Sequence, residues 1–114
     1  RTHKIAEATR YALKEAGLHL HLESGFSDTV TVFDIPKETT CNEILMTMRN
    51  EHQIMLAGSF DDLSGKVIRI GHMGSNANFE DMMATMAALS KTLTSLGVAL
   101  KGNLAELFLK AYLN

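Results

Sequence analysis

The residue with the clearest chemical potential is Arg69, which lies in the middle of an apolar stretch from Gly65 to Gly74. The stretch reads Gly-Lys-Val-Ile-Arg-Ile-Gly-His-Met-Gly, a pattern typical of a short strand bounded by turn glycines. Because an unpaired charge is costly to bury, this arginine needs a neighbouring carboxylate, a structural anion or an anionic ligand. Its planar guanidinium can hold a carboxylate through two parallel hydrogen bonds. Spacing alone favours the simpler interpretation, a solvated arginine or a structural ion pair.

Two histidines and the single cysteine are further candidates for chemistry. His19 and His21 alternate with leucines, so in an extended segment they share one face. A metal site there lacks further ligands at suitable spacing, and solvated or singly hydrogen-bonded histidines are the favoured interpretation. Cys41 falls on the apolar stripe of an expected helix, with no histidine placed to activate it. We interpret this cysteine as a small core residue.

The remaining polar candidates do not complete an active site. Asp61 and Asp62 adjoin each other in a loop, which is typical of a solvated turn, whereas paired acid–base chemistry needs a spatially opposed partner. His72 follows the arginine strand closely enough to flank whatever the arginine binds, and we expect it to have a structural role. The glycines around it match neither the P-loop nor the dinucleotide-binding fingerprint. No Gly-x-Ser-x-Gly elbow is present.

Apolar periodicity and capping signals predict four helices and three strands. The predicted elements, in chain order, are a helix over 1–16, a strand over 29–33, a helix from 41, strands over 54–57 and 66–70, a helix from about 78 to 96, and a helix from 104. This order predicts an α/β fold of the two-layer α+β type. A small antiparallel or mixed sheet of about three strands would have helices packed on one face. The other face is expected to show Thr29, Thr31, Val67 and Arg69, and to be a candidate docking surface.

Size and charge exclude several classes of function. The chain has 114 residues, enough for one domain, and its formal net charge of -2 gives no electrostatic case for nucleic acid or anionic membrane. Its apolar runs are shorter than a membrane span, and no signal peptide is recognisable. One cysteine favours a reducing compartment, so we expect a cytoplasmic location. The chain starts at Arg1 within a helical pattern, as expected of a piece of something longer.

The segment from Gly65 to Gly74, followed by Asn76 and Ala77, resembles a signature of the class V aminotransferases, which are pyridoxal-phosphate enzymes of fold type I. It is most similar to the branch of alanine–glyoxylate and serine–pyruvate aminotransferases. The order of the surrounding segments agrees, so the resemblance covers the chain to about Gly97. It implies that residues 1–114 are the C-terminal small domain of such an enzyme, without the large cofactor-binding domain.

The resemblance implies one site residue. In this family the small domain presents an arginine that binds the substrate α-carboxylate, and the matching residue is Arg69. The Schiff-base lysine, the aspartate at the pyridine nitrogen and the phosphate cradle belong to the large domain. No catalytic, cofactor-binding or metal-binding residue is therefore expected in this chain, and Lys66 is expected to reach solvent. Relatives often carry a second glycine after Gly58, where this chain has Ser59, so the preferred amino acid is left open.

The activity implied for the full-length protein is transfer of an amino group from a small amino acid (alanine or serine) to a 2-oxo acid (glyoxylate or pyruvate). Pyridoxal phosphate is the implied cofactor and a homodimer the implied assembly; this chain alone is expected to be inactive. Two alternatives stay open. One is a stand-alone binding domain in which Arg69 pairs with a partner's carboxylate, and the other is a pyridoxal-phosphate lyase on the same scaffold.

Overall fold

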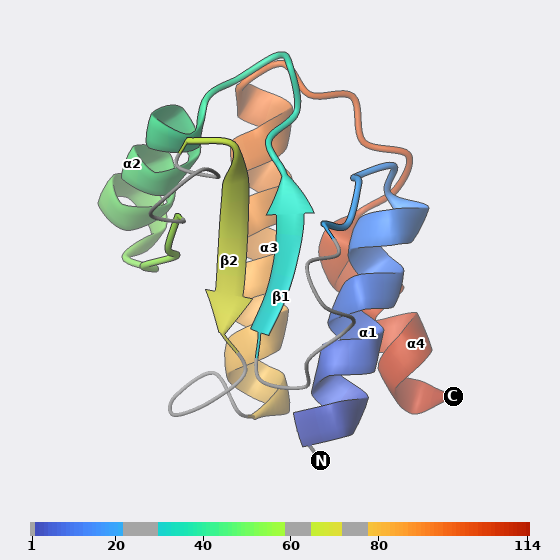
Figure 1. Cartoon of the computed structure of the whole chain (residues 1–114). Helices are drawn as coiled ribbons and strands as arrows, with labels where there is room; N and C mark the ends of the chain where they lie inside the picture. The colour runs from blue at the N-terminus through green and yellow to red at the C-terminus, as the bar shows by residue number, and fades with distance from the viewer. Residues whose placement is uncertain (1, 22–29, 59–64, 72–77) are drawn as a thin grey trace.

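Four helices and two strands make up the part of the chain that the computed structural model describes, residues 2–21, 30–58, 65–71 and 78–114 (Figure 1). Their order along the chain confirms the α/β fold. The elements are α1 (Thr2–Glu15), β1 (Val30–Asp34), α2 (Cys41–His52), β2 (Val67–Gly71), α3 (Phe79–Ser95) and α4 (Leu104–Leu113). None of these helices has the length and apolarity needed to cross a membrane.

The two strands form an antiparallel ribbon in which Val32 is paired with Arg69. One further residue extends the ladder on each side of the ribbon: Leu20 bridges to Phe33, and Ala57 bridges to Arg69. Short extended segments therefore flank both outer edges of the ribbon. They satisfy backbone groups that an edge strand otherwise leaves unpaired.

One face of the ribbon is packed against helices, and no helix in the described part of the chain covers the other face. Figure 1 looks onto the uncovered side, with α3 behind the two strands and α1 beside α4. On the packed side, Phe33, Ile68 and Ile70 are fully buried and belong to the same core cluster as the inward side chains of α3. The fully buried side chains that α3 contributes to this cluster are Met82, Met86, Leu89 and Leu93. The core thus lies between the ribbon and the helix layer.

The helices begin where the sequence predicts caps. The Thr40 hydroxyl accepts a hydrogen bond from the Glu43 backbone N–H (3.1 Å), and the Thr40 N–H donates to the Glu43 carboxylate (3.2 Å), forming the predicted capping box. Asn78 caps α3 and Asn103 caps α4 in the same way, by accepting from a backbone N–H three residues on. Helix α3 ends before Gly97, whose positive φ of 93° terminates it.

The expected composition of the uncovered face was partly wrong. Thr31 is buried on the helix side, because it shares a face of β1 with Phe33, whose large apolar ring is the stronger reason to face the core. Val67 is also buried, so the exposed part of β2 is confined to Arg69 and Gly71. Thr29 lies outside the described residues. We call the uncovered side of the ribbon the outer face; its described strand residues are Val30, Val32 and Asp34 of β1 and Val67, Arg69 and Gly71 of β2.

The third predicted strand, over residues 54–57, forms only a single bridge, so the sheet has two strands and not about three. The predicted antiparallel pairing is present at that bridge, where Arg69 N–H donates to the Ala57 carbonyl at 2.7 Å. The sequence predicted that this segment is buried, but Met55 is 77% exposed. A Cβ atom at the following Gly58 would lie 3.2 Å from the Cys41 sulfur, so a larger residue would be crowded there. Among the described residues of this segment, Ala57 is the one that pairs with the ribbon.

Neighbouring residues of β1 provide a direct test of which face is packed. Phe33→Ala is expected to lower the free energy of unfolding by about 3–5 kcal/mol, because a fully buried aromatic ring is lost. Val32→Ala, on the outer face, is expected to cost less than half as much. Urea unfolding of the chain and of both variants measures the difference. Equal losses would show that the two faces have been assigned incorrectly.

Candidate functional site

The candidate site is centred on Arg69, whose side chain is exposed between the buried side chains of Ile68 and Ile70. Alternation along β2 directs the arginine onto the outer face when both isoleucines enter the core. Its backbone is held on both sides, by pairing with Val32 of β1 and by the bridge to Ala57. The strand therefore fixes the position of the Arg69 backbone, while the side chain is exposed to solvent.

No carboxylate within the described part of the chain forms an ion pair with Arg69. The strand arginine is therefore exposed and is not part of a structural ion pair with a described residue. Asp34 is the one acidic residue among the described strand residues of the outer face, and its carboxylate contacts two histidines instead. Of the alternatives that the sequence left open, a structural ion pair with a described carboxylate is not present, and both a solvated arginine and a guanidinium available to an anionic ligand fit these observations.

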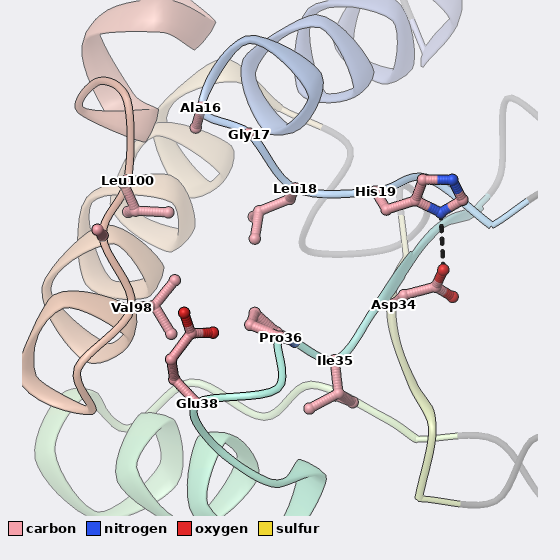
Figure 2. Close-up of a pocket in the computed structure, with 11 residues that line it drawn as sticks. Ala16, Gly17, Leu18, His19, Asp34, Ile35, Pro36, Glu38, Val98 and Leu100 are labelled. Carbon is pink, nitrogen blue, oxygen red and sulfur yellow. Dashed lines mark hydrogen bonds and ion pairs between the residues drawn. The ribbon is translucent and has the colours of Figure 1, made fainter.

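His19 and His21 both bind Asp34 through their Nδ1 atoms. The distance from His19 Nδ1 to Asp34 Oδ2 is 2.7 Å (Figure 2), and the distance from His21 Nδ1 to Asp34 Oδ1 is 3.1 Å. A carboxylate can only accept, so each Nδ1 carries the donated hydrogen. Each imidazole makes this one contact to Asp34, in agreement with the interpretation of singly hydrogen-bonded histidines. No set of three or more His, Cys, Asp or Glu side chains in the described residues is arranged to hold a metal ion.

Sequence reasoning had not placed Asp34 in this group, because it considered the residue only as the end of a strand. Asp34 is paired with Val67 in the ribbon, and its backbone N–H donates to the His19 carbonyl at 2.8 Å. The signal that could have revealed the group is an alternating His-x-His segment together with an aspartate at a strand end. That signal still requires knowledge of which strands are neighbours. Asp61, Asp62 and His72 lie outside the described residues.

No protein-family model matches the chain, but individual proteins do. An uncharacterized aminotransferase of Methanocaldococcus jannaschii is 33% identical over 102 residues, which cover 89% of this chain and 26% of that protein. A soluble hydrogenase small subunit of Synechococcus sp. is 31% identical, over 85% of this chain and 25% of that protein. A serine–glyoxylate aminotransferase of Arabidopsis thaliana is 29% identical, over 82% of this chain and 24% of that protein.

Solved structures agree with the sequence matches. The chain superimposes on a ureidoglycine–glyoxylate aminotransferase of Bacillus subtilis with a TM-score of 0.91 and 26% identity, covering 99% of this chain and 30% of that one. An alanine–glyoxylate aminotransferase of Nostoc sp. gives a TM-score of 0.74 and 32% identity, covering 81% of this chain and 25% of that one. This chain is homologous to a part of the class V aminotransferases. It spans about a quarter of the length of the curated relatives it matches.

Two cavities of the chain differ in the groups that they could offer to pyridoxal phosphate. The first, of about 230 Å³, lies between the end of α1, the end of β1 and the segment after α3 (Figure 2). It has an apolar floor that includes Leu18 and Val98, with the carboxylates of Asp34 and Glu38 at its edge and no lysine in its lining. The second, of about 330 Å³, has Lys91 but no carboxylate in its lining.

Neither cavity brings together an amine for the cofactor aldehyde and a carboxylate for its ring nitrogen. Lys66, at the start of the arginine strand, is exposed, as expected. Neither of these two cavities therefore fits a complete pyridoxal-phosphate site.

Cys41 is a core residue of this aminotransferase homologue and not a nucleophile. Its side chain is buried under the ribbon, with the sulfur 3.8 Å from the Val67 carbonyl oxygen. Burial raises the pKa of the Cys41 thiol above its usual value, because the charged thiolate is poorly solvated there. A raised pKa leaves less of the reactive thiolate at neutral pH, which confirms the interpretation of Cys41 as a core residue.

The rate of thiol modification tests this assignment. At pH 8 we expect Cys41 in the native protein to react with a disulfide reagent about tenfold more slowly, or slower still, than in urea. Both the raised pKa and the burial act in this direction. The rate should also continue to rise with pH above the range where an exposed cysteine levels off. Equal rates in the native and denatured states would contradict the buried location.

Proposed function

We propose that this chain is the C-terminal small domain of a pyridoxal-phosphate aminotransferase, and that Arg69 binds the α-carboxylate of its substrates. The observation that supports this proposal most directly is an exposed strand arginine on a helix-free face, with no ion pair to a described residue. A guanidinium in that state can donate two parallel N–H···O hydrogen bonds to the two oxygens of a carboxylate. Both amino acids and 2-oxo acids carry such a carboxylate.

The substrates we propose are a small amino acid such as alanine or serine as donor, and glyoxylate or pyruvate as acceptor. Three similar proteins are named for reactions with glyoxylate, and their named donors are serine, ureidoglycine and alanine. Arg69 can serve every one of these molecules, because it contacts the carboxylate that they share. Selection among donors would then depend on groups that contact the side chain of the amino acid.

Within this proposal, the chain contributes binding and orientation. Arg69 fixes the carboxylate end of the substrate, which restricts the rotation of the remaining bonds and places the amino-bearing carbon at a defined distance from the outer face. Pyridoxal phosphate would supply the chemistry that carries the amino group between substrates, and residues outside this chain would hold it. We further propose a cytoplasmic homodimer; the assembly rests on the family resemblance and the location on the single cysteine.

Substitution of the arginine in the full-length enzyme tests the carboxylate role. Arg69→Gln is expected to raise the KM for the amino donor about 30- to 900-fold, which corresponds to about 2–4 kcal/mol for two charge-assisted hydrogen bonds. The absorbance of bound cofactor should be unchanged, because Arg69 does not contact the cofactor in this proposal. Lys66→Gln, which removes an exposed charge near the same strand, is the matched control and should leave KM within about twofold. An unchanged KM in Arg69→Gln would remove this arginine from the site.

Experiments on the isolated chain test whether the cofactor site of the proposed enzyme lies outside residues 1–114. We expect residues 1–114 alone to show no transamination and no stable absorption band on titration with pyridoxal phosphate, because neither described cavity combines a lysine with a carboxylate. Slow, non-saturating modification of exposed lysines is the background to subtract, and it is measured with the same chain in urea. A saturable, stoichiometric band in the native chain would contradict the assignment of the cofactor site to residues outside it.

A further inference from the structure

Asp34 and Arg69 are diagonal neighbours on the outer face of the ribbon. Arg69 is paired with Val32, and Asp34, two residues further along β1, is paired with Val67. In antiparallel ribbons such diagonal positions are about 7–8 Å apart, a distance that a long side chain can span. An arginine and an aspartate in these positions are therefore expected to form a cross-strand ion pair.

This ion pair is not formed, and Asp34 has two other partners. Its Oδ2 atom lies 2.7 Å from His19 Nδ1 and its Oδ1 atom lies 3.1 Å from His21 Nδ1, so each oxygen accepts one imidazole hydrogen (Figure 2 shows the first bond). No described carboxylate forms an ion pair with Arg69. We refer to His19, Asp34 and His21 as the histidine bracket.

We propose that the histidine bracket is a positioning device: His19 and His21 engage Asp34 so that it does not capture Arg69, which leaves the guanidinium available to the carboxylate of a substrate. This inference rests on the proposed function of Arg69 and deepens it. The two histidines act through Asp34 and do not contact the substrate in this proposal. They keep an internal competitor away from the binding group.

Backbone hydrogen bonds near Asp34 favour contacts of this aspartate with the two imidazoles over a contact with Arg69. The His21 N–H donates to the Val32 carbonyl at 2.9 Å, and the Asp34 N–H donates to the His19 carbonyl at 2.8 Å. These bonds hold both histidines beside the aspartate, with their side chains on its face. Each of these contacts orders the two side-chain torsions of one imidazole, whereas a contact from the arginine would order four, so each single histidine contact costs less conformational entropy.

The test is to remove the bracket in the full-length enzyme while keeping Arg69. His19→Val with His21→Val deletes both donors and retains residues suited to an extended segment. Asp34 is then free to pair with Arg69, and substrate must displace it. We expect the KM for the amino donor to rise about two- to fivefold, the range that an exposed ion pair produces, with kcat unchanged. His52→Val, which removes a histidine elsewhere in the chain, is the matched control.

Adding Asp34→Asn to the double variant separates this role from a merely structural one. The amide cannot form an ion pair with the guanidinium, so we expect the triple variant to recover the original KM, although it lacks all three members of the bracket. An unchanged KM in the double variant, or a raised KM that Asp34→Asn does not restore, would overturn the proposal. Should the double variant fail to fold, His21→Val with and without Asp34→Asn gives the same comparison.

Arg69→Gln, assayed in parallel, distinguishes the two levels of inference. A large rise in KM for Arg69→Gln together with no effect of the histidine substitutions would leave the carboxylate role intact and refute the bracket alone. No effect of Arg69→Gln would refute both. The supporting result is a large effect of Arg69→Gln, a small KM-only effect of the double histidine variant, and its reversal by Asp34→Asn.

Discussion

The packing of one face of a two-stranded ribbon against α3 is the constraint on which the candidate site depends. Phe33, Ile68 and Ile70 are fully buried in that layer, and their burial determines the register of both strands. Because side chains alternate strictly along a strand, a shift of one residue would turn every outward group inward. Arg69 points away from the helices as a consequence of its two apolar neighbours. The position of this candidate side chain is therefore stabilised by apolar residues of the core.

The outer face combines this geometric constraint with an electrostatic one. A single guanidinium and a single carboxylate on a narrow face attract each other, and an arginine engaged in that way is less available to a ligand. In this chain each carboxylate oxygen of Asp34 accepts one hydrogen bond, from His19 or from His21. Packing thus determines the side on which Arg69 lies, and hydrogen bonding within the face leaves its charge without a described partner.

Local signals were sufficient to predict most elements of this fold and insufficient to predict how the outer face is assembled. The cap at Thr40 and the arginine strand were predicted correctly because their determinants lie within a few residues of one another. The orientation of Thr31 was predicted wrongly, because alternating threonines and valines fit either face until the position of Phe33 is taken into account. Asp34 was missed because its partners are 13 and 15 residues away and meet it only through strand pairing.

The strength of the proposed carboxylate contact has a further structural requirement. An arginine–carboxylate pair in water contributes about 1 kcal/mol or less, whereas orientation of a substrate requires a larger contribution. Exclusion of water would increase the favourable free energy of this pair, since the pair is stronger where the effective dielectric constant is low. The outer face is suited to being covered, because Val30 and Val32 lie on it beside the exposed arginine. In the proposed enzyme the domain would supply a correctly directed charge, and a second domain closing over the valines would make that charge effective.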